Sequence, residues 1–200
     1  MKNILIFFIV LIVQNSFSQT KIYQCDSIYH KKGYIVSLTN IKNSDDENES
    51  KNNIIFTFYK KQKNKKTIIY QENLYSHFNN VEFKDFNGDN IKDILVEYVS
   101  DVRSNLHYHL FLVDLKKNKL IKIINFNKIK NPEYLKKYNL VSNLVMSGRN
   151  WTGFYKIENN RVKDFGYTFY WQDENGNDTS DKGYDKILNK ILKSEKKYKK

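Results

Sequence analysis

Short segments in which apolar and polar residues alternate cover most of this chain, and they constrain its fold more than any other feature. A period of two residues is typical of strands that bury one face of a sheet. Fifteen tyrosines, 13 phenylalanines and a single proline suit such strands. We expect strands at residues 34–41, 54–59, 67–71, 81–84, 94–99, 108–114, 120–126, 143–146, 151–157 and 161–171.

The close spacing of these segments, with polar turns between them, indicates antiparallel pairing. No linker rich in Pro, Gly or Ser divides the chain. The fold class expected is therefore mainly β: a single antiparallel β sandwich or a partly closed barrel.

Two segments depart from the strand pattern. Asn131, Pro132 and Glu133 fit the start of a short internal helix, because they suit its N-cap and its first turn. Near the end, apolar residues recur at three- and four-residue spacing and predict a C-terminal amphipathic helix. They are Tyr184, Ile187, Leu188, Ile191 and Leu192.

The beginning of the sequence has the layout of a secretory signal peptide. Lys2 precedes an apolar run at 4–13, and a polar stretch with small residues ends at Ser18. The run is about half the roughly 20 residues that a membrane anchor needs. We expect residues 1–18 to be removed and 19–200 to form one domain, periplasmic or secreted, with no integral membrane segment. The single cysteine, Cys25, has no disulfide partner in the chain, and we expect a free thiol.

The formal net charge of +12 would attract nucleic acid, anionic lipid or acidic proteins. An exported protein rarely meets nucleic acid, so we expect no nucleic-acid partner. The lysines are scattered along the chain, which favours solvated surface over a dedicated basic site.

The stretch DFNGDNIKD, residues 85–93, carries oxygen ligands on alternate residues. Calcium takes six to eight such ligands, and a curled loop supplies several. The side chains of Asp85, Asn87, Asp89 and Asp93 and the backbone carbonyl of Ile91 are the candidate ligands. We expect calcium to be the cofactor.

Asn90 stands where calcium loops usually have glycine with a positive φ, and asparagine is the best substitute for glycine there. Beyond the stretch, Val96 replaces the glutamate that would close an EF-hand, so we do not expect an EF-hand. The alternative is a turn rich in Asn and Asp that holds no metal. A weaker copy of the spacing, which favours a plain loop, occurs at Asp173, Asn175, Asn177 and Asp181.

The sequence offers no constellation for catalysis. His107 and His109 would point to one face of a strand, but no third zinc ligand is suitably spaced. Nucleophile elbows and phosphate-binding glycine loops are missing. We therefore expect a protein that is not an enzyme.

Three ordered segments carry a resemblance: VEFKDFNGDNIKDILVEY from 81, RSNLHYHLFLVDLKKNKLIKI from 103, and NPEYLKKYNLVSNLVMSGRNWTGFYKIENNRVKDF from 131. Together they resemble periplasmic calcium-loop proteins that share the fold of the invertebrate-type lysozyme inhibitors. The nonapeptide is also similar to FG-GAP calcium loops, although no run of copies supports a propeller. The resemblance implies a calcium-stapled β domain that inhibits peptidoglycan-cleaving enzymes, in some members as an immunity protein.

The resemblance also implies two loops that would contact a partner. The first contains Arg103 and Asn105 and is followed by Tyr108, and the second contains Arg149 and Trp151. Arginine and aromatic side chains suit the centre of an interface. The alternative for the second loop is a core tryptophan beside a surface arginine.

We therefore expect an exported calcium-binding β domain that binds and inhibits a cell-wall (peptidoglycan) hydrolase. The alternative is a calcium-stabilised envelope or adhesion module that binds anionic glycans and has no enzyme partner.

Overall fold

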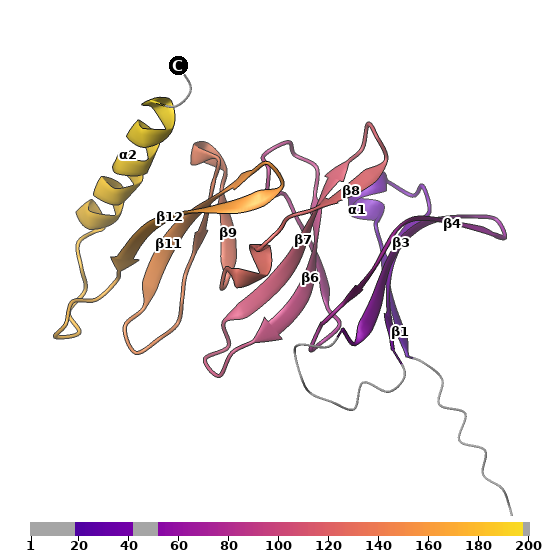
Figure 1. Ribbon diagram of the computed structural model, residues 1–200, viewed down its shortest axis with the longest axis horizontal. Helices are drawn as coiled ribbons and strands as arrows, with labels where there is room; N and C mark the ends of the chain where they lie inside the picture. The colour runs from indigo at the N-terminus through magenta and orange to yellow at the C-terminus, as the bar shows by residue number, and fades with distance from the viewer. Residues whose placement is uncertain (1–18, 42–51, 198–200) are drawn as a thin grey trace, which may run out of the picture.

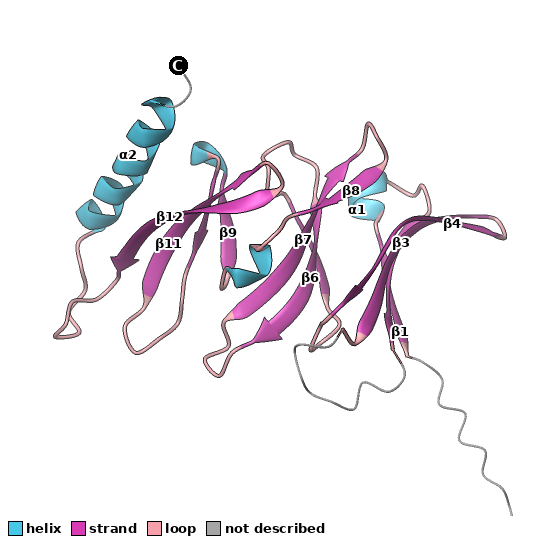
Figure 2. Ribbon diagram, in the orientation of Figure 1, coloured by secondary structure: helices cyan, strands magenta, loops and turns pink. Residues whose placement is uncertain are grey.

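The computed structural model describes residues 19–41 and 52–197, so the expected signal peptide at 1–18 lies outside the described residues. The described residues form twelve strands, two α-helices and two 3-10 turns (Figures 1 and 2). The strands are β1 (Thr20–Gln24), β2 (Tyr34–Asn40), β3 (Ile54–Gln62), β4 (Lys65–Leu74), β5 (Val81–Lys84), β6 (Asp93–Ser100), β7 (Leu106–Asp114), β8 (Lys119–Lys122), β9 (Pro132–Leu135), β10 (Leu140–Asn143), β11 (Trp151–Glu158) and β12 (Arg161–Tyr170). The helical elements are α1 (Asp26–Tyr29), η1 (Phe126–Lys128), η2 (Lys136–Tyr138) and α2 (Asp181–Lys197).

The strands form three open sheets of four strands each, and in every sheet consecutive strands pair antiparallel. We call β1–β4 the first sheet, β5–β8 the middle sheet and β9–β12 the last sheet. Figure 1 shows the sheets in a row in chain order, with α2 beyond the last one. The mainly β class and the antiparallel pairing are confirmed. The partly closed barrel is wrong, because each sheet ends at its fourth strand instead of closing on itself.

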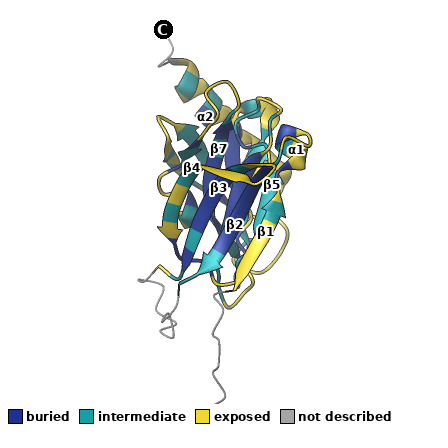
Figure 3. Cartoon of the chain, turned by 90° about the vertical axis from the view of Figure 1, so that its right-hand side faces the viewer, coloured by how far each residue is buried: buried dark blue, intermediate teal, exposed yellow. Residues whose placement is uncertain are grey.

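The middle sheet is covered on both faces, and this burial organises the core. Ile94 and Phe111 pack toward the first sheet, where the Phe111 ring stacks on Phe56 at 4.5 Å between centroids. Leu95 and Leu110, whose side chains point the other way, pack toward the last sheet. β6 therefore consists of buried residues from Asp93 to Glu97 (Figure 3 shows the burial along the chain).

The predicted C-terminal helix is confirmed, and it covers the outer face of the last sheet. Leu188 and Ile191 of α2 are buried with Leu140 and Phe154 of the sheet. None of the helices in the described part of the chain has the length and apolar character needed to cross a membrane.

The predicted helix that would start at Asn131 is wrong. Pro132–Leu135 is strand β9, paired with β10, and only Lys136–Tyr138 forms a single 3-10 turn. Asn131 does not cap a helix: its Oδ1 accepts a hydrogen bond from the backbone N–H of Leu106 at 2.7 Å. A contact with a distant strand thus replaces the local capping bond.

Other elements differ from the sequence-based expectation in extent. The strand expected at 120–126 ends at Lys122, and the one expected at 143–146 is β10, which ends at Asn143. The sequence pattern did not predict β1 and α1. Cys25 lies between them as a fully buried free thiol, and burial raises its pKa to about 12.

Candidate functional site

The two candidate sites of the sequence lie at opposite ends of β6. The segment 85–93 leads into this strand, and the loop 101–105 leaves it for β7. The calcium loop and the candidate partner loops are thus separated by the length of one strand.

In the loop 85–93 the side-chain oxygens accept hydrogen bonds from the loop's own backbone. Asp85 Oδ1 accepts from Gly88 N–H at 2.7 Å, and its Oδ2 accepts from Asn90 N–H at 2.9 Å. Asp89 Oδ1 accepts from Ile91 N–H at 2.8 Å. These bonds curl the backbone around the carboxylates.

Asn87 and Asn90 complete this curl. Asn87 Oδ1 accepts from Asp89 N–H at 3.0 Å. Asn90 has a φ of +66°, the left-handed conformation expected at the position where such loops place glycine. Its Oδ1 accepts from Lys136 Nζ at 2.5 Å, which ties the loop to the last sheet.

Asp93 is the one fully buried carboxylate of the loop. Its Oδ2 accepts from Phe86 N–H at 2.8 Å, and its Oδ1 accepts from Val113 N–H at 3.0 Å. Desolvation raises its pKa to about 7; the two amides oppose this shift, and the charges of Asp89 and Asp85 add to it. The negative charge at Asp93 is therefore unfavourable without a proton or a cation.

The donor set suits calcium by its chemistry, since carboxylates, an amide oxygen and a backbone carbonyl are hard oxygen ligands. Within residues 19–41 and 52–197, however, no three carboxylate, imidazole or thiolate side chains converge closely enough to form a metal-binding group. Calcium at Asp85, Asn87, Asp89, Ile91 and Asp93 therefore stays a prediction, and binding would require these groups to draw together.

A buried amide holds together the two loops at the other end of β6. Asn105 is 1% exposed. Its Oδ1 accepts from Met146 N–H at 2.7 Å, and its Nδ2 donates to the Met146 carbonyl at 2.9 Å. The loop 101–105 thus lies beside the segment 144–150 that connects β10 to β11. We call these two segments the paired loops.

Asp101 anchors the first of the paired loops. It accepts from Lys130 Nζ at 2.7 Å, from Asn105 Nδ2 at 2.9 Å and from Arg103 N–H at 2.9 Å. The lysine, followed by the amide donors, holds the pKa of Asp101 well below its usual range. Asp101 was considered from the sequence only as a distant ligand for the calcium loop, and neither its anchoring role nor Lys130 was predicted; an aspartate four residues before an asparagine in a turn was the available signal.

The paired loops expose apolar side chains beside a cation. Val102 is fully exposed, and Leu144 and Met146 are about half exposed. Arg103 is exposed next to Val102. These four residues form what we call the rim patch.

The remaining candidate partner residues are less accessible. Tyr108 is buried in the core, and its hydroxyl donates to Glu82 Oε1 at 2.8 Å. The Arg149 guanidinium lies 4.2 Å from the centroid of the Tyr170 ring, and its Nε donates to the Gln172 carbonyl at 2.6 Å. Trp151 is half-buried at the start of β11. Of the five predicted partner residues, Arg103 is the most open to solvent, whereas Asn105 positions the loops from inside.

The histidine pair contacts backbone carbonyls. His107 Nδ1 lies 2.9 Å from the Asn127 carbonyl, and His109 Nε2 lies 3.1 Å from the Tyr75 carbonyl. Burial lowers the pKa of His109 to about 4, so its ring is neutral at physiological pH.

The second Asn/Asp-rich stretch forms a turn around one carboxylate. Asp173 Oδ1 accepts from the backbone N–H groups of Asn175 at 2.8 Å and Asn177 at 2.9 Å. These bonds form a turn closed by Asp173, and the expectation that it is a plain loop stays a prediction.

Comparison of the chain with known proteins gives no match: no family model fits the sequence, and no curated protein or solved structure is similar to it.

Proposed function

We propose that this protein is an exported, calcium-stabilised β domain that binds a peptidoglycan hydrolase through the rim patch and blocks it. The observation that carries the proposal is the pair of hydrogen bonds between Asn105 and Met146. They hold two loops from different sheets side by side, so that the exposed apolar side chains belong to an ordered surface.

The composition of the rim patch suits a protein partner. Val102, Leu144 and Met146 are exposed on two adjoining loops, and exposed apolar surface is a feature of interaction sites. Arg103 is a side chain that pairs well with a carboxylate, and carboxylates serve as the catalytic acids of enzymes that cleave glycan chains. The net charge is +12 for the full sequence and, without Lys2 of the expected signal peptide, 12 − 1 = +11; it favours an acidic hydrolase, because a basic one would be repelled.

Calcium has a structural role in this proposal. Asp85, Asn87, Asp89 and Asp93, with the carbonyl of Ile91, would hold the ion, and its charge would offset the burial of the Asp93 carboxylate. The ion would stabilise the start of β6, one strand away from the rim patch, and would not touch the partner.

The proposal is tested by following the clearing of a peptidoglycan suspension by acidic hydrolases with and without the protein. The test variant combines Val102→Asp and Met146→Asp, which place charges in the rim patch. We expect inhibition by the wild type and a loss of at least about tenfold in the variant, since a buried interfacial charge is costly.

The matched control combines Ile22→Asp and Ile68→Asp, two changes at exposed apolar residues of the first sheet. We expect this variant to inhibit like the wild type. Equal loss of inhibition in both variants, or no inhibition of any hydrolase by the wild type, would contradict the proposal.

A further inference from the structure

The solvent face of α2 carries a line of lysines. Lys182, Lys186, Lys190 and Lys193 follow one another at intervals of four, four and three residues and are all exposed. At 1.5 Å per residue their backbone positions span about 16 Å of the helix, with steps of about 4.5 to 6 Å along the axis. We call these four residues the lysine stripe.

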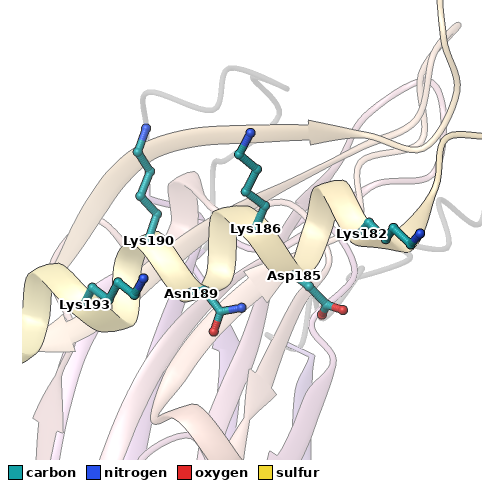
Figure 4. A pocket seen from close by; sticks show the side chains of 6 residues that line it. All are labelled: Lys182, Asp185, Lys186, Asn189, Lys190 and Lys193. Carbon is teal, nitrogen blue, oxygen red and sulfur yellow. The ribbon is translucent and has the colours of Figure 1, made fainter.

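The stripe borders a shallow hollow that also includes Asp185 and Asn189. In Figure 4 the side chains of Lys186 and Lys190 extend in the same direction, and those of Asp185 and Asn189 extend the opposite way. Four cations and one anion therefore line the hollow. Lys190 Nζ lies 5.2 Å from the centroid of the Tyr167 ring on β12, which supports its side chain.

The stripe lysines differ from other lysines near α2. Lys156 and Lys163 both pair with Glu195 of the helix, the latter at 2.8 Å. Within the part of the chain that the structure describes, no ion pair involves a stripe lysine. Glu195 thus pairs with lysines of the sheet, whereas Asp185, which lines the same hollow as the stripe, forms no ion pair with any of its four lysines.

The arrangement is also unfavourable for the helix itself. Like charges four residues apart repel one another on a helix surface. Lys182 stands in the first turn, where the helix dipole disfavours a cation. A bound chain of anions would relieve both effects.

We propose that the lysine stripe binds a linear anionic glycan, with the acidic groups of successive sugars placed along the four ammonium groups. A bilayer surface is a poorer occupant, because the apolar residues of α2 that would enter it are packed against the last sheet. Single-stranded nucleic acid usually requires aromatic rings for base stacking, and the Tyr167 ring beside the stripe lies under Lys190. This inference is independent of the rim patch and of hydrolase inhibition.

The test measures binding to fluorescent polygalacturonate, a linear glycan with one carboxylate per sugar, at low and physiological salt. The stripe variant replaces all four lysines by glutamine, which keeps helix propensity. The control variant makes the same replacement in the exposed β3–β4 hairpin and so removes the same charge. Its substitutions are Lys61→Gln, Lys63→Gln, Lys65→Gln and Lys66→Gln.

We expect the wild type to bind, with an affinity that falls as salt rises, and the stripe variant to bind at least about tenfold more weakly. The hairpin variant should lose less than about threefold. Equal losses in the two variants would overturn the proposal, since net charge alone would then explain binding. It would also be overturned by no binding at low salt, or by equal or tighter binding to phosphatidylglycerol vesicles or duplex DNA.

Discussion

Two aspartates at the ends of β6 have opposite electrostatic surroundings. Asp93, at the start of the strand, is fully buried with two backbone N–H donors and has two other aspartates nearby. Asp101, just after the strand, has amide donors and the ammonium group of Lys130. Burial raises the pKa of Asp93 to about 7, whereas the lysine lowers that of Asp101.

The loop at Asp101 has a lysine paired with its carboxylate, whereas among the described residues no lysine or arginine forms an ion pair with a carboxylate of the loop 85–93. At the Asp101 end the chain supplies its own positive charge, and the loop is fixed by contacts with the last sheet. At the Asp93 end the carboxylates accept hydrogen bonds from amide groups. A bound ion is therefore expected to stabilise the loop 85–93 and to leave the loop 101–105 unchanged.

The largest change in stability is expected in the loop 101–105. Asn105→Ala should lower the free energy of unfolding by about 3 kcal/mol, because backbone groups of Met146 and the carboxylate of Asp101 lose a buried partner. Urea denaturation measures this change. Asn175→Ala, in the exposed turn after Asp173, should change stability by less than about 0.5 kcal/mol. A loss below about 1 kcal/mol for Asn105→Ala would mean that this amide does not hold the paired loops together.

The next largest change in stability is expected from calcium binding at the loop 85–93. Calcium at 100 times its Kd should stabilise the chelator-treated protein by about 2.7 kcal/mol, which thermal melts and calorimetric titration measure. Combining Asp85→Ala with Asp89→Ala should abolish the stabilisation, whereas Asp173→Ala should preserve it. No shift in the wild type, or loss of the shift in the Asp173 variant, would reduce the loop 85–93 to a turn without metal.

His109 makes the stability of the protein depend on pH, and this contribution must be separated from those of Asp93 and Asp101. Because the pKa of His109 is about 4 in the folded protein and near 6.5 when unfolded, the unfolded chain binds the proton more readily. This contribution to stability is present above pH 6.5 and is lost as the pH falls toward 4. The expected loss between pH 7 and pH 5 is about 2 kcal/mol.

The variant His109→Gln keeps a donor near the Tyr75 carbonyl and does not titrate in this range. The difference between wild type and variant, measured by urea denaturation at both pH values, isolates the histidine because the aspartates are the same in both proteins. A difference that does not change with pH would show that the folded protein accommodates a charged His109.

The smallest effect concerns the loop's backbone. Asn90→Gly should change stability by less than about 0.5 kcal/mol, since glycine also adopts positive φ. Asn90→Ala should cost about 1 kcal/mol, because alanine is strained there. Urea denaturation of both variants measures the difference, and equal costs would indicate that the bond from Lys136 matters more than the backbone conformation.

The accuracy of the sequence-based predictions depended on the range of the interactions. The positive φ of Asn90 and the helix α2 were predicted because their causes lie within a few neighbouring residues. The helix expected at Asn131 was wrong because the side chain of Asn131 bonds to Leu106, 25 positions earlier. The partner of Asn105, Met146, is 41 positions away, and no local pattern indicates it.

The sequence by itself determined the strand-rich class, the Asn/Asp turns and the amphipathic face of α2. Alternation, turn chemistry and helical spacing act between residues close in the chain, and their physical causes can be read there. The tertiary structure alone decided that three open sheets stack in a row, that Asp93 loses its solvent while Asp101 gains a lysine, and that the paired loops meet. Each of these outcomes depends on packing between segments far apart in the chain, whose free energy is fixed only when both segments are in place.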